Sequence, residues 1–320
     1  MRYIDVFNGD ADGICALHQL RLADPLESEL VTGLKRDIAL LERVEAGDGD
    51  VVTVLDVSLD RNRTPLMRLL ERGAVVRYFD HHFAGPIPQH PNLDLMIDAS
   101  GAACTSALVD RHLWGRYRPW AVVGAFGDGL PEVARSLAQS LNLDAHVLDT
   151  LRDLGETLNY NAYGETPLDV ILPPIDLYRA IREYEDPFDL LRDEPLIAQM
   201  SYEREADLDR ALATGPVVRL AAFDAFLLPD EAWSRRVSGT FANRLALDDP
   251  QRTHVVLTPN GEGYVVSVRS PEGSVPSAVE FCRRYPGGGG RVNAAGIDGI
   301  PVDTLQPFLD ALEGEKWTLH

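Results

Sequence analysis

Aspartate and histidine side chains recur directly after short apolar segments of this 320-residue chain. They are Asp10, Asp12, Asp56, Asp80, His81, His82 and Asp128. Carboxylates brought this close together would repel one another, and a bound divalent cation is the usual remedy. Asp and His ligands without thiolates suit Mn²⁺ or Mg²⁺ better than zinc. The residue types therefore predict a divalent-cation site, provided that the fold brings them together.

Alternating strand and helix patterns predict elements that would bring these Asp and His residues together. Strands are predicted at Tyr3 to Phe7, Val51 to Val57, Val75 to Phe79, Leu95 to Ile97 and Val122 to Phe126, and helices at Gly13 to Ala23 and Pro65 to Arg72. Val- and Ile-rich strands alternating with helices predict an α/β fold with a parallel sheet. Ligands of such sheets bind beyond the carboxyl ends of the strands, which is where the aspartates lie.

Each of these residues also has a plain structural interpretation. Asp10 to Gly13 alone is more often a turn and helix cap than a metal site. A single Asp56 is usually a capping or solvated residue, and a single histidine is usually a structural one. These interpretations do not explain why aspartate follows several successive strands, so the joint pattern favours a site.

The chain is predicted to contain two domains and a connector. Residues 1–185 form the parallel-sheet domain, 186–250 a helical connector, and 251–320 a smaller α+β domain. In the last region, Pro259 to Gly263 is a hairpin signature between two β-type segments. A helix near Ala278 to Arg284, a four-glycine loop and a helix from Leu305 follow.

Composition limits the classes of function. A formal net charge of −20 disfavours stable complexes with long nucleic acids but permits short anionic substrates. Three widely spaced cysteines, the lack of an apolar signal segment and the lack of a membrane-spanning run predict a cytoplasmic protein that contacts no membrane. A homodimer is compatible with these features, and the sequence leaves the oligomeric state open.

Five segments together resemble the DHH phosphoesterase superfamily, named for its Asp-His-His tripeptide. In chain order they are Asp10 to Gly13, Asp56, Tyr78 to His82, Gly124 to Asp128 and Gly287 to Gly296. The first four resemble the motifs of the catalytic DHH domain, in a RecJ-like form. The last resembles the glycine-rich loop of the accessory substrate-binding domain, called DHHA1, so the resemblance covers nearly the whole chain.

The resemblance implies a role for each matching residue. The implied ligands of two divalent cations, Mn²⁺ in preference to Mg²⁺, are Asp10, Asp12, Asp56, His81 and Asp128. Asp56 would bridge the ions, Asp80 would orient a histidine, and His82 would contact the scissile phosphate. The implied substrate-binding residues are Gly288, Gly289, Gly290, Arg291 and Asn293.

Two positions depart from the superfamily pattern. Some branches have a histidine ligand four residues before the first aspartate, where this chain has Val6. The glycine loop usually continues with histidine, where this chain has Arg291, a residue that can bind a phosphate or stack on a base. Separately, the amides and hydroxyls of Thr105 and Ser106 would either hold a phosphate or cap a helix.

These observations predict a metal-dependent phosphodiesterase that hydrolyses short oligonucleotides or linear dinucleotides to mononucleotides by two-metal activation of water. Two further enzymatic hypotheses are a RecJ-like single-strand exonuclease and a cyclic-dinucleotide phosphodiesterase. A regulatory protein that binds nucleotides without turnover is the hypothesis from another class. The metal-ligand pattern argues against it, whereas Val6 and Arg291 keep it open.

Overall fold

The computed structural model describes residues 1–261, 263–315 and 317–319. It divides into two units, Met1–Tyr202 and Glu203–His320, with helix α9 (Pro195–Leu212) spanning the division. The sequence-based boundaries after residues 185 and 250 differ from this division. Strand β7 (Phe223–Leu227) and helix α10 (Ala232–Asp248) come from the region predicted as a connector, and both belong to the second unit.

The first unit is built on a five-stranded sheet in the order β2-β1-β3-β4-β5. The strands are β1 (Tyr3–Asn8), β2 (Glu29–Gly33), β3 (Val51–Leu55), β4 (Val75–Asp80) and β5 (Leu93–Ile97). Every neighbouring pair is parallel. The α/β class with a parallel sheet is therefore confirmed, and β2 is a strand that the sequence patterns did not predict.

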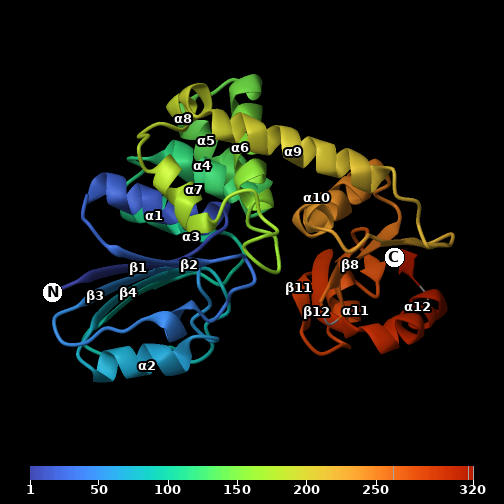
Figure 1. Cartoon of the computed structure of the whole chain (residues 1–320), viewed down its shortest axis with the longest axis horizontal. Helices are drawn as coiled ribbons and strands as arrows, with labels where there is room; N and C mark the ends of the chain where they lie inside the picture. The colour runs from blue at the N-terminus through green and yellow to red at the C-terminus, as the bar shows by residue number, and fades with distance from the viewer. Residues whose placement is uncertain (262, 316, 320) are drawn as a thin grey trace. The chain divides into compact units, whose positions relative to one another are not determined.

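Helices cover both faces of this sheet (Figure 1). Those of the first unit, with α9, are α1 (Ala11–Ala23), α2 (Arg63–Glu71), α3 (Thr105–His112), α4 (Arg118–Gly127), α5 (Pro131–Ala138), α6 (Ala145–Tyr160), α7 (Pro174–Ile181) and α8 (Pro187–Asp193); short 3₁₀ turns are η1 (Leu40–Arg43) and η2 (Gln139–Leu141). Val54 and Tyr78 pack towards α2 in one apolar cluster. Phe7 and Phe79 pack with the larger helical layer in the other.

The predicted strand at Val122 to Phe126 is wrong, because these residues lie within helix α4. The segment is buried on every side, and a fully buried helix has no polar face to reveal its period. Pro119 in its first turn is compatible with a helix start. Asp128 therefore caps a helix rather than ending a strand.

The second unit contains a six-stranded sheet in the order β11-β12-β9-β8-β7-β6. Its remaining strands are β6 (Val218–Arg219), β8 (Thr253–Asn260), β9 (Gly263–Arg269), β11 (Gly288–Arg291) and β12 (Ala294–Pro301), with β10 (Ser274–Val275) and β13 (Thr318–Leu319) forming a separate pair. The predicted hairpin is present as β8 and β9, and its turn residue Glu262 lies outside the described residues. The predicted four-glycine loop is largely edge strand β11.

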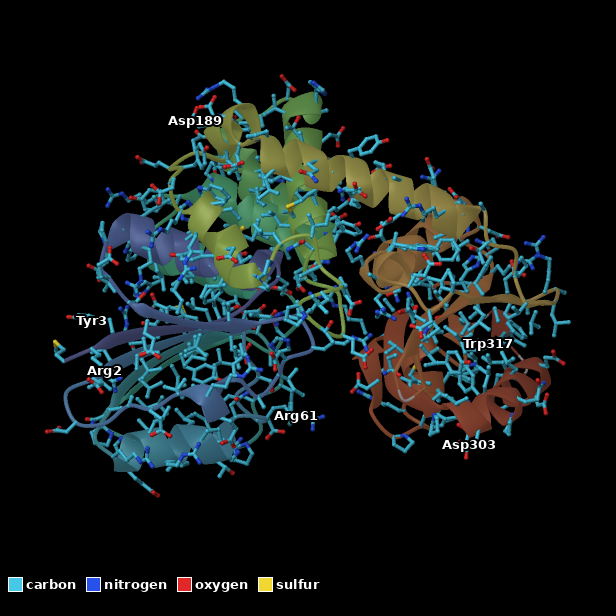
Figure 2. All side chains as sticks on the ribbon, viewed as in Figure 1. Arg2, Tyr3, Arg61, Asp189, Asp303 and Trp317 are labelled. Carbon is cyan, nitrogen blue, oxygen red and sulfur yellow. The ribbon has the colours of Figure 1, made fainter. Side chains whose placement is uncertain are left out.

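Helices α11 (Ala278–Cys282) and α12 (Leu305–Gly314) and the 3₁₀ turn η3 (Val302–Thr304) complete the second unit. Its core has a cluster of aromatic rings, in which Phe281 lies 5.2 Å from Trp317, centroid to centroid. Trp317 is labelled in Figure 2. Among the helices of the described residues, none combines the length and apolar character that crossing a bilayer requires.

Candidate metal centre

Asp10 and Asp12 lie where strand β1 gives way to helix α1. Asp10 is the N-cap of α1, and its Oδ1 accepts a hydrogen bond from the amide of Gly13 at 3.1 Å. A Cβ atom at Gly13 would lie 2.2 Å from the carbonyl oxygen of Asn8, so only glycine fits there. The structural interpretation of this motif as a helix cap thus holds for Asp10, and the cap also places two buried carboxylates side by side on one turn.

The N-terminus of helix α3 fixes the carboxylate of Asp12. The Thr105 amide donates to Asp12 Oδ2 at 2.7 Å, and the Ser106 amide donates to Asp12 Oδ1 at 2.8 Å. These are the amides for which the sequence suggested either a phosphate contact or a helix cap, and both residues are fully buried. The helix terminus therefore binds an anion of the protein itself, which removes its amides from the predicted phosphate contact.

Asp56 follows strand β3 in a left-handed backbone conformation, with φ of 58°. Its amide donates to the carbonyl of Phe79 at 3.0 Å, and its Oδ1 accepts from the Thr105 hydroxyl at 3.2 Å. Aspartate, asparagine and glycine tolerate this conformation better than other residues. The turn therefore aims a buried carboxylate at the centre of the cluster.

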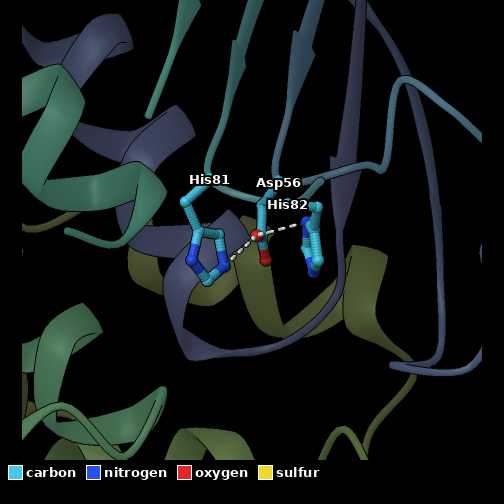
Figure 3. Close-up of side chains that lie close together, drawn as sticks. All are labelled: Asp56, His81 and His82. Atoms are coloured by element: carbon cyan, nitrogen blue, oxygen red, sulfur yellow. Dashed lines mark ion pairs between the residues drawn. The ribbon is translucent and has the colours of Figure 1, made fainter. Parts of the chain in front are cut away.

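The imidazoles of His81 and His82 lie on either side of the Asp56 carboxylate (Figure 3). His81 Nε2 is 3.3 Å from Asp56 Oδ1, and His82 Nδ1 is 3.9 Å from the same oxygen. Asp80 accepts a 2.6 Å hydrogen bond from His82 Nδ1 through its Oδ1, so it orients this ring. The His82 side chain is 43% exposed against 11% for His81, so His82 is the histidine that a substrate can reach.

Asp128 completes the cluster from the C-terminal end of α4. Its Oδ2 lies 3.9 Å from His81 Nε2. Close helix packing sets its position, because a Cβ atom at Gly127 would lie 2.3 Å from the Cβ of Ala11 and 2.7 Å from the carbonyl oxygen of Gly155. Glycine at this point lets α4 approach both α1 and α6.

The spacing of these atoms fits a bound cation. His81 Nε2 lies 3.3 Å from an Asp56 oxygen, 4.0 Å from Asp12 and 3.9 Å from Asp128. Ligands around an octahedral ion with bonds of about 2.1 Å are separated by roughly 3 Å at right angles and roughly 4.2 Å across the ion. Asp56, His81 and His82 also present ligand atoms within 4.8 Å of one another. The donor set of oxygen and imidazole nitrogen suits Mn²⁺ or Mg²⁺.

The electrostatics of the cluster favour a cation as well. Burial and the charges of Asp10 and Asp12 raise the pKa of Asp56 well above its usual range. Burial opposes the charged form of His81, but the hydrogen bond and charge of Asp56, aided by Asp12, outweigh it and raise its pKa to about 10. For His82, contact with Asp80 likewise overcomes burial and raises the pKa to about 9. The raised pKa values show that the neighbouring carboxylates favour added positive charge at this site, which a bound cation would supply.

Solved structures share the fold across nearly the whole chain. A manganese-bound exonuclease RecJ aligns with a TM-score of 0.60 at 17% identity, over 97% of this chain and 88% of that one. RecJ from Thermus thermophilus with Mn²⁺ aligns at 0.62 and 17% identity, over 97% of this chain and 51% of that one, and it has also been solved with Mg²⁺. The pGpG-specific phosphodiesterase PggH of Vibrio cholerae aligns at 0.55 and 15% identity, over 98% and 97%.

The chain shares the fold of these RecJ and PggH structures. Sequence comparison adds nothing, because no family model matches the chain and no curated protein matches it either. The segments Asp10 to Gly13, Asp56, Tyr78 to His82 and Gly124 to Asp128 lie together at the carboxyl edge of the parallel sheet.

Lys35 belongs to the cluster, and the sequence did not single it out. Its Nζ lies 2.5 Å from Asp10 Oδ2, 3.1 Å from Asn159 Oδ1 and 3.9 Å from Asp128 Oδ1. It follows β2, the strand that the patterns missed, so nothing placed it beside Asp10. Burial alone would lower its pKa, but the charge of Asp10 raises it well above the usual range. A signal was present all the same, since Lys35 is one of only two lysines in the chain.

The substrate-binding residues that the resemblance implied lie in the second unit. Gly288, Gly289, Gly290 and Arg291 form β11, which pairs with β12 in antiparallel register. Gly290 has a φ of 136°, and a Cβ there would lie 2.6 Å from the Cα of Ala295, so this position requires glycine. Arg291 is exposed, and the carbonyl of Asn293, in the turn between the strands, accepts the Ser270 amide at 3.0 Å.

Proposed function

We propose that this protein is a divalent-cation-dependent phosphodiesterase that hydrolyses short oligonucleotides or linear dinucleotides to mononucleotides. The observation that carries the proposal is the gathering of His81 with the carboxylates of Asp12, Asp56 and Asp128 at the carboxyl edge of a DHH-fold sheet. The structural likeness to a RecJ exonuclease and to a pGpG-specific phosphodiesterase supports a phosphodiester substrate. The acidic composition supports a short one.

In this proposal Asp12, Asp56, His81 and Asp128 would hold Mn²⁺. A bound cation of this kind would offset the charge of the phosphate and lower the pKa of the attacking water. The chain itself contributes His82, whose Nδ1 donates to Asp80 Oδ1, so its ring is oriented, and contact with Asp80 raises its pKa against the opposing effect of burial. Its other nitrogen then donates to a phosphate oxygen and stabilises the charge that develops in the transition state.

The choice of substrate gives the direct test. With Mn²⁺, purified protein is expected to hydrolyse a linear dinucleotide such as pApA with a kcat/KM at least about tenfold above that for a long single strand. Release of mononucleotides measured by chromatography checks this. Faster hydrolysis of long single strands would favour the exonuclease hypothesis. Hydrolysis of a cyclic dinucleotide alone would favour the cyclic-dinucleotide phosphodiesterase. Binding of pApA without turnover under any divalent metal would favour a regulatory protein.

Arg291 is proposed to bind the substrate, together with the β11 glycines and Asn293. Replacing Arg291 by alanine is expected to raise the KM for a dinucleotide roughly tenfold, with kcat changed little, because a charge-assisted contact made equally in the ground and transition states is lost. Steady-state kinetics measure both constants. Arg244→Ala is the matched control, since Arg244 is an exposed arginine on α10 that pairs with Asp248. A KM equal to that of this control would remove Arg291 from the binding site.

A further inference from the structure

The ammonium group of Lys35 lies in a setting that resembles a cation site. Three oxygen atoms face it, from the Asp10 and Asp128 carboxylates and the Asn159 amide, at 2.5, 3.9 and 3.1 Å. The ring of Tyr163 is 5.6 Å away, and the Lys35 backbone is anchored by a 3.0 Å bond from its amide to the carbonyl of Ala162. The side chain is 24% exposed, so the charge is held in place rather than solvated.

The surroundings of Asp10 leave few ligands for a metal ion there. One of its oxygens accepts from the amide of Gly13 and the other from Lys35. Val6, at the position of a histidine in some branches of the superfamily, is fully buried in the apolar cluster that includes α2. The side-chain oxygen of Asn8, another candidate ligand, accepts the amide of Asp10 at 3.2 Å. The Asp10 side of the cluster is thus poor in metal ligands and already holds a positive charge.

We propose that the ammonium of Lys35 takes the place of the second cation, so that the chain binds a single divalent cation, at Asp12, Asp56, His81 and Asp128. This inference rests on the proposed function and revises the two-ion arrangement that the resemblance implied. A second divalent ion at Asp10 and Asp56 would lie within a few ångströms of the ammonium, and like charges at that distance repel strongly where solvent screening is weak. Lys35 neutralises Asp10 and keeps one positive charge at the site without metal.

In this arrangement the divalent ion and the Lys35 ammonium have different roles. The ammonium has three N–H donors and one charge, and it has no ligand sphere to fill. It therefore holds Asp10 and offers a donor to a phosphate oxygen. The one divalent ion would supply the charge that activates water. We accordingly expect Lys35 to be a positioning and charge-balancing residue, whose loss alters how many metal ions bind as well as the rate.

Counting bound metal tests the inference directly. Wild-type protein equilibrated with excess Mn²⁺ and then desalted is expected to retain about one Mn²⁺ per chain by elemental analysis, with the electron paramagnetic resonance spectrum of an isolated ion. About two per chain with an exchange-coupled spectrum would overturn the role of Lys35. No retained Mn²⁺, together with no turnover, would overturn the proposed function instead, so the two failures are distinguishable.

Substitution of Lys35 supplies the second test. Lys35→Met removes the charge and keeps the length of the side chain, so it frees Asp10 and is expected to raise the Mn²⁺ content towards two per chain. Lys35→Arg retains the charge and is expected to stay near one, even if the Met variant folds poorly. Arg36→Met is the matched control, because it removes a positive charge from the exposed neighbouring residue. Equal Mn²⁺ content in the Lys35→Met and Arg36→Met variants would contradict the proposal.

Discussion

Replacing Asp56 by asparagine is expected to abolish turnover and, at the same time, to stabilise the metal-free protein. The residue is 2% exposed, and the pKa of its carboxyl is raised by burial and by the charges of Asp10 and Asp12. Asparagine keeps the shape and tolerates the left-handed backbone at φ of 58°, but it carries no charge. We expect kcat to fall roughly 1000-fold or more, since several kcal/mol of charge stabilisation are lost with the cation.

The gain in stability comes from the removal of repulsion between buried carboxylates. We expect about 1 kcal/mol, which corresponds to roughly 3 °C in the Tm of a unit of this size. Scanning calorimetry with EDTA and with Mn²⁺ measures both states. Mn²⁺ should raise the Tm of the wild type and leave the Asn variant nearly unchanged. Asp94→Asn, at an exposed position of β5, is the matched control. Retained turnover, or a lower Tm in EDTA, would contradict this view of Asp56.

The second large effect concerns the ion pair that joins β1 to α1. Two guanidinium nitrogens of Arg21 each lie 2.7 Å from an oxygen of Asp5, which also accepts from the Ser28 hydroxyl at 2.6 Å. The Asp5 side chain is 1% exposed and that of Arg21 is 12% exposed. Arg21→Met would leave Asp5 charged and buried without its partner. We expect the free energy of unfolding to fall by about 3 kcal/mol, or roughly 6–12 °C in Tm.

The matched control for this pair is Arg179→Met on α7. Arg179 pairs with Asp176 three residues away, and both side chains are about half exposed. Such surface pairs contribute about 0–1 kcal/mol, so this variant should unfold close to the wild type. Urea unfolding followed by circular dichroism compares the variants. If Arg21→Met unfolds together with the control, the buried pair contributes no more than a surface pair.

Much of the site could be predicted because its residues follow strands directly. A strand of apolar residues can be recognised from the sequence, and the carboxyl ends of parallel strands meet at one edge of the sheet. These two rules are enough to predict that four residues lie close together, namely Asp10, Asp12, Asp56 and His81. Asp128 belongs to the same cluster, although the element before it was predicted wrongly. A fully buried helix and a fully buried strand have the same apolar composition, so the sequence did not distinguish them.

The remaining features depend on contacts that no local pattern encodes. Lys35 meets Asn159 across 124 positions of the chain, and it follows a strand of mixed polarity, Glu29–Gly33, that shows no clear β pattern. The amides of Thr105 and Ser106 looked available for a phosphate, since their acceptor lies 93 and 94 positions earlier. The glycines of β11 were predicted as a loop, because glycine disfavours strands unless a neighbouring backbone comes close.

Asp12 and Lys35 form hydrogen bonds with residues far away in the sequence, which affects the order in which the site folds. Asp12 acquires its partners only when residues 105 and 106 are in place, and Lys35 acquires Asn159 only when α6 has docked. Closing such long loops is costly in chain entropy, so these contacts form late, after the local helices and first strand pairs. A nascent chain shorter than about 160 residues therefore lacks the complete cluster, and tight cation binding marks a fully assembled first unit.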